Sequence, residues 1–405
     1  MNAHSISENV SLIENVNSFS DARRLFPVTE SCVYLDSAHY SQFSLETRRR
    51  LIEFIDSYTF TNKNLSLVNM RTTDSLKDIC AKLINADKED IIITGSTTHG
   101  LNIFANGVIL DKGDCVVYAD SEFPAIVYPW MNQEKLRGIR NVMIPSDNGK
   151  IKLEDIERTI IENKGKVLTI SSVEFLGFRN DLSAISTICK KNNCFFVVDA
   201  IQSAGICPLD VKKQEVDFLS VGSQKWMMAP AGVGFAYISP AIKDRVNPTY
   251  VATSSIEYDF KNFLHYKLSF RKDGSAYENS TPNTLGMIGM QSSIELFLKL
   301  GVENILRHIL HLQDIFIEEM KDTNFKIISD LEPVHRSNIL IFSYSDNTMN
   351  DQIQKELERN NIFIALREGF LRLSAHIFNN ENDIFALTNV LKKFLIKISS
   401  VFCRS

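Results

Sequence analysis

The chain has 405 residues, of which 44% are apolar and 23% charged; these ordinary values exclude collagen-like, low-complexity and largely disordered proteins. This length favours two or three domains and supplies enough apolar residues for a large core. The net charge of −5 leaves no excess of basic residues to hold a nucleic-acid backbone, so we expect no nucleic-acid partner.

The seven cysteines are scattered along the chain, and none lies in a Cys/Cys or Cys/His cluster with the spacing of a zinc site, so we expect no metal. Several lie within apolar runs, where cysteine packs as a small apolar residue, and this usage favours a reducing compartment. Residues 1–19 are polar and lack the pattern of a signal peptide. No apolar run reaches the roughly 18 residues that a membrane span needs. We therefore expect a cytoplasmic protein with no membrane partner.

The middle of the chain alternates short apolar runs with amphipathic stretches. The amphipathic stretches at 98–110 and 183–193 predict helices. The apolar runs predict strands at 90–95, 115–120, 166–175, 194–200, 216–222 and 234–239. Such alternation is typical of a mostly parallel sheet covered by helices on both faces, whose strands are apolar throughout because both faces are buried. The sequence therefore predicts an α/β fold.

The pattern changes after about residue 285. Apolar residues at three- and four-residue spacing over 287–320 predict one long helix. The segments that follow, at 338–345, 363–378 and 382–398, predict a small α+β unit. We therefore divide the chain into an N-terminal segment, a large α/β domain and a smaller C-terminal α+β domain, at 1–30, 31–280 and 281–405.

Three predicted strands lead into polar residues, and ligands of an open parallel sheet bind beyond the carboxyl ends of its strands. Asp199 follows five apolar residues, and Lys225 follows the next strand, where burial would lower the pKa of an amine and let it form a Schiff base. Thr97 and Thr98 stand at a helix start, whose free N–H groups and dipole attract a phosphate. Taken singly, each pattern is also typical of an ordinary feature: a structural carboxylate, a surface lysine or a helix N-cap.

The three patterns together match the needs of one cofactor. Pyridoxal phosphate (PLP) requires a phosphate cradle, a carboxylate on its pyridine nitrogen and a lysine on its aldehyde. Asp199 would keep that nitrogen protonated, so that the ring withdraws electrons from a bound amino acid. We therefore predict a PLP-dependent enzyme that acts on a small amino-acid substrate through Lys225.

These motifs, together with YLDSAHYSQ at 34–42 and RLSAHIFNNENDI at 372–384, resemble the class V aminotransferases of PLP fold type I. That family includes cysteine desulfurases, isopenicillin N epimerase-like proteins and C–S lyases. The resemblance covers nearly the whole chain and implies a homodimer with shared active sites. It implies that Lys225 carries the cofactor, and that further cofactor contacts come from Thr97, Thr98, Phe123, Asp199, Gln202, Ser223, Gln224 and, across the dimer, Thr281.

The resemblance also assigns roles to single residues. Gln202 corresponds to the partner of the ring hydroxyl, and Phe123 to the ring that stacks on the cofactor. Arg372 corresponds to the arginine that pairs with the substrate α-carboxylate, for which a planar two-pronged donor is well suited. His39 falls where the family's N-terminal segment approaches the substrate; it could discriminate substrates, assist proton transfer or pack locally.

The chain departs from the desulfurase pattern at several positions. Phe123 and Gln224 stand where desulfurases usually carry histidines. Residues 366–371, before Arg372, lack the nucleophilic cysteine of that pattern, and Cys403 lies too near a polar C-terminus for us to expect it to replace that nucleophile. Because an enzyme-bound persulfide needs a thiolate, these departures favour transamination, epimerisation or C–S lysis. Cysteine desulfuration and a non-catalytic interaction role are the alternatives.

Overall fold

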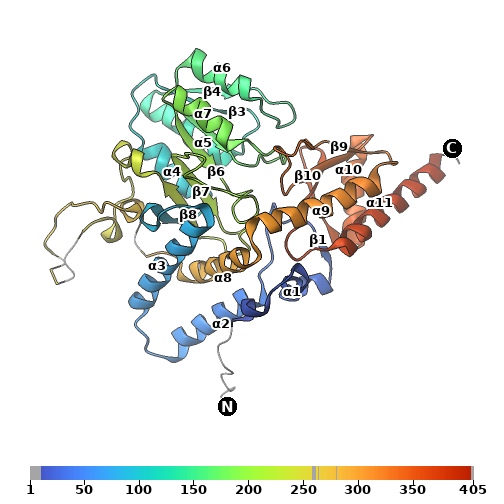
Figure 1. Ribbon diagram of the computed structural model, residues 1–405, viewed down its shortest axis with the longest axis horizontal. Helices are drawn as coiled ribbons and strands as arrows, with labels where there is room; N and C mark the ends of the chain where they lie inside the picture. The colour runs from blue at the N-terminus through green and yellow to red at the C-terminus, as the bar shows by residue number, and fades with distance from the viewer. Residues whose placement is uncertain (1–10, 258–260, 263, 280, 403–405) are drawn as a thin grey trace.

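The computed structural model describes residues 11–257, 261–262, 264–279 and 281–402, the last eight of these by their backbone alone (Figure 1). A seven-stranded sheet forms its centre, in the order β2-β8-β7-β6-β5-β3-β4. β8 is antiparallel to both of its neighbours and the other adjacent strands are parallel, which confirms the predicted α/β fold. The strands are β2 (Ile91–Thr94), β3 (Cys115–Ala119), β4 (Arg140–Ile144), β5 (Gly165–Ser171), β6 (Phe195–Asp199), β7 (Phe218–Gly222) and β8 (Gly234–Ile238).

Helices cover both faces of this sheet, as the uninterrupted apolar strands require. On one face, α4 (Thr97–Gly107) and α5 (Pro124–Arg137) pack against the strands around Phe104 and Trp130. The helices of the other face share a larger apolar core; they are α3 (Leu65–Ile84), α6 (Leu153–Asn163), α7 (Leu182–Lys191) and α8 (Thr284–Leu300). Both faces of the sheet are therefore buried, and the polar residues that end or follow its parallel strands lie along its carboxyl edge.

A second, antiparallel sheet of four strands, in the order β12-β13-β10-β9, forms the C-terminal unit. Its strands and helices are β9 (Phe325–Ile327), β10 (Leu340–Tyr344), β12 (Ala365–Arg367), β13 (Phe370–Leu373), α9 (Val302–Met320), α10 (Asn350–Arg359) and α11 (Glu381–Phe402). Near the N-terminus, α1 (Phe19–Arg23) precedes β1 (Val33–Tyr34), which pairs in parallel with β11 (Ile362–Phe363). This pairing brings residues 33–36 beside the C-terminal unit. The domain boundaries that we assigned from the sequence remain a prediction.

The single helix predicted over 287–320 is in fact two helices, α8 and α9, separated at Gly301. Gly301 has a φ of +82°, in the region that a residue without a side chain adopts at low cost, so the helical hydrogen bonds stop there. The break lets the two helices pack against different parts of the molecule. α8 packs against α2 (Leu45–Phe60) and α3, while α9 packs against α11 (Figure 1).

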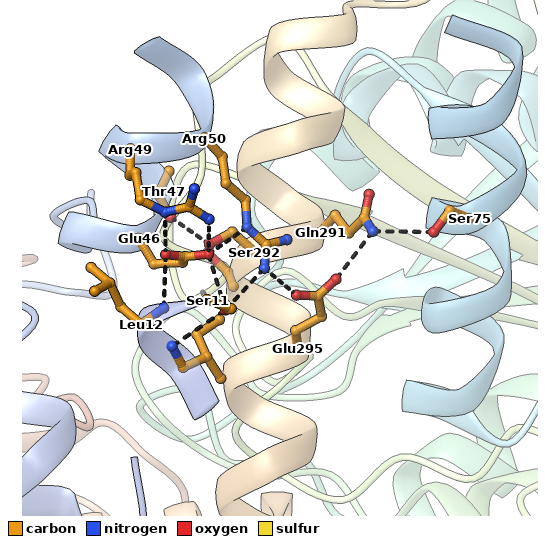
Figure 2. A network of polar contacts seen from close by, with 12 residues as sticks. Ser11, Leu12, Glu46, Thr47, Arg49, Arg50, Ser75, Gln291, Ser292 and Glu295 are labelled. Atoms are coloured by element: carbon orange, nitrogen blue, oxygen red, sulfur yellow. Dashed lines mark hydrogen bonds and ion pairs between the residues drawn. The ribbon is translucent and has the colours of Figure 1, made fainter. Parts of the chain in front are cut away.

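A buried ion-pair network joins the N-terminal segment to α2 and α8 (Figure 2). The side chain of Glu46 is fully buried and accepts hydrogen bonds from Arg49, Arg50 and the backbone N–H of Leu12. Arg50 also pairs with Glu295 of α8, at 2.6 Å. Burial alone would raise the pKa of Glu46, but these cationic and N–H donors hold it at about 2. The network therefore stabilises the charged form of a buried carboxylate.

We expect Glu46→Gln to lower the free energy of unfolding by about 3 kcal/mol at pH 7, because the folded pKa lies well below the ordinary value of 4.5. A depressed carboxyl pKa stabilises the fold above the unfolded pKa. The difference between variant and wild type should therefore shrink as the pH falls from 4.5 towards 2. Urea denaturation at pH 7 and pH 3 measures it. Glu53→Gln, the control, removes an exposed partner of Arg49 and should cost about 0.5 kcal/mol or less; equal effects of the two substitutions would contradict this account.

Candidate active site

Lys225 and Asp199 lie at the carboxyl edge of the central sheet. Asp199 ends β6 and Lys225 follows β7, the adjacent parallel strand, so the register of the sheet brings them together. Asp199 is 3% exposed and accepts a hydrogen bond from the Ile201 N–H at 2.9 Å. Burial raises the pKa of Asp199 to about 6 and lowers the pKa of Lys225 to about 8, although the two opposite charges attract. The edge thus holds a carboxylate and an amine whose pKa values both lie near neutral pH.

Two further buried carboxyl groups lie near Asp199. Glu122 accepts hydrogen bonds from the N–H and the hydroxyl of Ser171, both at 2.7 Å. Glu174 accepts one from the Asn180 side chain at 2.7 Å. Burial raises the pKa of Glu122 to about 8 and that of Glu174 well above its usual range, with like charge from Asp199 adding to both shifts. Burial therefore disfavours the charged forms of Glu122 and Glu174 more strongly than that of Asp199.

Aromatic rings form a wall beside Lys225. Phe123, the residue before α5, is 46% exposed, and its ring centroid lies 5.9 Å from that of Phe175. The Lys225 Nζ lies 5.4 Å from the Phe123 centroid, and the Arg372 guanidinium carbon lies 5.6 Å from the Phe175 centroid. The strand predicted over 166–175 ends at Ser171, so Phe175 lies outside the sheet. The wall therefore connects the amine of Lys225 with the guanidinium of Arg372.

Arg372 enters the site from the C-terminal unit. It lies on β13 and is 1% exposed, and its Nε is a buried donor without a described partner. One guanidinium nitrogen lies 3.5 Å from Asp36, whose other oxygen lies 3.4 Å from His39 Nδ1. Burial lowers the pKa of Arg372 to about 10, so the group stays charged at neutral pH. Asp36 and Arg372 lie close together because Asp36 forms a parallel β-bridge with Ser374, two residues after Arg372.

The start of α4 has the features of an anion site. The N–H groups of a helix's first turn have no intrahelical acceptor. Thr97 opens the helix, and its hydroxyl is buried without a described partner. A Cβ at Gly222 would lie 2.8 Å from the Thr97 hydroxyl and 3.0 Å from Gln224 Oε1, so only a glycine leaves this space free. The unpartnered Thr97 hydroxyl, the helix start and the free space beside Gly222 fit a phosphate. Thr98, next on the helix, is exposed.

Three of the residues predicted to bind the cofactor, Gln202, Ser223 and Thr281, either have hydrogen-bond partners within the chain or are exposed. The Gln202 side chain accepts a hydrogen bond from Trp226 at 2.7 Å and donates one to the Ala38 carbonyl at 3.2 Å. The Ser223 hydroxyl donates to the Pro230 carbonyl at 2.6 Å, within its own loop. Thr281 is exposed. The roles assigned to these residues remain predictions.

Several residues of the site were not predicted from the sequence. Asp36 lies within the segment YLDSAHYSQ but was not singled out there, and Phe175 was assigned to a strand; both reach the site through contacts distant in sequence. Glu122, directly before Phe123, was hidden because an isolated acidic residue at a helix start is common. Arg367 was also missed, although the Glu-Gly pair that follows it indicates a tight turn between two strands. That turn places Arg367 and Arg372 on paired strands.

The hairpin before Arg372 contains no thiol. β12 and β13 are joined by Glu368 and Gly369 alone, both with positive φ values of 48° and 80°. Two such residues make the tightest common hairpin turn, which leaves no room for a longer loop at this position. The six described cysteines are all unpaired, and none has a hydrogen bond to Lys225, Asp199 or Arg372. Cys403 lies outside the described residues.

The described part of the chain contains no cluster of three or more His, Cys, Asp or Glu side chains that could hold a metal ion. Among the same residues, no helix combines the length and the apolar character needed to cross a membrane.

Together, the fold and the strand-end lysine and carboxylate define an α/β enzyme of the PLP-dependent type. Residues 33–387 match the family described as Aminotransferase class-V, so the chain belongs to the class V aminotransferases. A "Probable cysteine desulfurase" of Borreliella burgdorferi is 26% identical, over 95% of this chain and 98% of its own. An apo structure of cysteine desulfurase from Thermococcus onnurineus NA1 has a TM-score of 0.83 at 23% identity, covering 94% of this chain and 98% of that one. The cystine C–S lyase C-DES, in complex with cysteine persulfide, has a TM-score of 0.82 at 21% identity, covering 90% and 98%.

The family match confirms the predicted resemblance to the class V aminotransferases, the predicted enzyme class and the predicted cofactor, PLP.

Proposed function

We propose that this enzyme removes the Cα proton of an amino-acid substrate and expels a sulfur-containing group from Cβ, as a C–S lyase without an enzyme-bound persulfide. The observation that carries this proposal is the two-residue turn Glu368-Gly369, which stands where a nucleophilic cysteine would be needed. The relatives whose names state desulfurase or C–S lyase activity support sulfur chemistry.

The residues of the site fit the cofactor, and each would contact a different part of it. Thr97, Thr98 and the start of α4, with Gln224 and Ser223 nearby, would hold the phosphate. Asp199 would keep a proton on the pyridine nitrogen, and Phe123 would cover one face of the ring. Gln202 would contact the ring hydroxyl, in competition with Trp226 and the Ala38 carbonyl, which bond to its side chain. When bound, PLP supplies an electron sink for the electrons left on Cα.

The remaining residues act on the substrate. The Arg372 guanidinium would bind the α-carboxylate in two-pronged fashion, and its buried Nε has a free hydrogen to donate. Lys225 would take the Cα proton, because a pKa of about 8 leaves part of the amine neutral at pH 7 and able to accept it. His39, on the exposed side of Asp36, would approach the substrate from the N-terminal segment. The aromatic wall between Lys225 and Arg372 would line the apolar side of the substrate site.

We also propose that two copies of the chain share their active sites in a cytoplasmic homodimer. Exposed apolar side chains gather on α2 and on the segment 264–268; they are Ile52, Ile55, Tyr58, Phe60, Leu264, Tyr266 and Leu268. Surfaces of this kind are typical of subunit interfaces. A second copy could bring its exposed Thr281 to the phosphate, and sedimentation velocity would test for the dimer by its mass.

Cysteine with a reductant that is not a thiol tests the outcome of the reaction. Elimination needs only Lys225 and the cofactor among the groups of the site, and hydrolysis of its product by one water gives sulfide, pyruvate and ammonia. Desulfuration needs a protein thiolate and gives alanine and a persulfide. We expect pyruvate in excess over alanine, measured by mass spectrometry. Alanine in amounts equal to the cysteine consumed, with a persulfide on any cysteine of the chain, would contradict the proposal.

A further inference from the structure

Arg367 and Arg372 lie on the same face of the C-terminal sheet. In the β12–β13 pair, Ala365 lies opposite Arg372 and Arg367 lies opposite Phe370. Because alternate residues of a strand share a face, Arg367 is on the face of Ala365 and hence of Arg372. Leu366 and Leu371, which lie opposite each other, face the apolar core on the other side of this sheet.

This shared face is directed at the active site. On the other side of β13, Arg372 lies opposite Ile341, which packs in the core of the large α/β unit. Arg372 itself contacts Asp36 and the ring of Phe175. The positive charge of Arg367 helps to lower the pKa of both Lys225 and Arg372, which places its guanidinium within electrostatic reach of both groups.

Neither arginine has a close anionic partner among the described residues. Arg367 is half-buried and donates one hydrogen bond, at 2.9 Å, to the carbonyl of its own neighbour Leu366. No acidic side chain in the described ranges forms an ion pair with it. Arg372 has Asp36 at the long distance of 3.5 Å and a buried Nε without a partner. A half-buried guanidinium without a counter-ion costs free energy that an anionic ligand would recover.

We propose that this arginine pair selects an amino acid whose side chain carries a second anionic group, with Arg372 binding the α-carboxylate and Arg367 the side-chain anion. The substrate class is thus an α-amino acid with an acidic side chain, including a cysteine conjugate whose sulfur substituent bears a carboxylate. The inference rests on the proposed function for the role of Arg372. A neutral side chain would leave Arg367 half-buried and unpaired beside the bound substrate.

Binding of two simple acids to the PLP-loaded enzyme tests the pair without turnover. Isothermal titration calorimetry would compare glutarate with pentanoate, which has the same carbon chain and one carboxylate. We expect glutarate to bind roughly 10-fold or more tightly, since a charged hydrogen bond is added. Arg367→Gln should abolish this preference, and Arg367→Lys should retain part of it. The control Arg359→Gln removes an exposed arginine of α10 and should leave the preference unchanged. Equal binding of both acids by the wild type, or an unchanged preference in Arg367→Gln, would overturn the inference.

A second assay separates this inference from the proposed reaction. Pyruvate formation would be compared for S-carboxymethylcysteine and S-ethylcysteine, which differ in the charge of the sulfur substituent. We expect a higher kcat/KM for the carboxymethyl compound and loss of that advantage in Arg367→Gln. Pyruvate from both compounds at equal kcat/KM would overturn the arginine assignment and leave C–S lysis standing. Preferential glutarate binding without pyruvate from either compound would support the arginine pair and contradict C–S lysis.

Discussion

Replacing Lys225 with alanine should lower turnover of every amino-acid substrate by about 10³-fold or more, because we propose that this residue is both the attachment point of the cofactor and the base at Cα. The fold should survive the change. Burial already lowers the pKa of this amine to about 8, so its charged form is unfavourable in the folded state. Removing it relieves that cost and offsets the packing that is lost.

Product formation and thermal unfolding of Lys225→Ala would be measured side by side. Lys166→Ala is the matched control, since Lys166 is an exposed lysine of β5, far from the carboxyl edge. We expect wild-type turnover in the control and a melting temperature within a few degrees of wild type in both variants. A Lys225→Ala enzyme that kept turnover within ten-fold of wild type would disprove the assignment of the base.

Asp199→Asn should slow Cα deprotonation by about 10²–10³-fold while PLP remains bound. An amide has the shape of the carboxylate but carries no charge, so it cannot hold a proton on the pyridine nitrogen. Burial raises the pKa of both Glu122 and Glu174, so we do not expect either of these neighbours to supply the missing charge. Exchange of the substrate Cα hydrogen with deuterated water, followed by mass spectrometry, measures this step directly.

Asp217→Asn provides a matched control for that substitution. Asp217 is also a partly buried carboxyl beside the central sheet, and it accepts a backbone N–H from Phe196 at 2.8 Å, much as Asp199 accepts one from Ile201. It precedes β7, at the end of the strand away from Lys225. We expect exchange at the wild-type rate in this control. Exchange in Asp199→Asn within a few-fold of wild type would refute the role of Asp199.

The lysine and the carboxylate could be predicted because they depend on local patterns. β6 and β7 are neighbours both along the chain and in the sheet, so an apolar run followed by Asp199, and the next run followed by Lys225, must bring the two residues to one edge. The helix start at Thr97 follows a strand in the same way. The uninterrupted apolar strands likewise indicated helices on both faces of the sheet.

The rest of the site depends on contacts that no local pattern contains. Asp36 meets Arg372 because residues 33–36 pair in parallel with a segment more than 300 residues away. Arg367 joins the site through the β12–β13 register, and a shift of one residue would turn it to the other face. The direction of the Ser223 hydroxyl, towards Pro230, depends on the conformation of one loop. The break at Gly301 follows from a positive φ that helical periodicity does not reveal.

The central claim is that the cofactor is attached to Lys225, and borohydride reduction followed by peptide mapping tests it most directly. Reduction makes the attachment permanent, and mass spectrometry then locates the added pyridoxyl phosphate group on the chain. We expect this mass on the peptide that contains Lys225, in wild-type protein and in Asp199→Asn, and its absence from Lys225→Ala. The same group on another lysine, or none on wild-type protein loaded with PLP, would contradict the account.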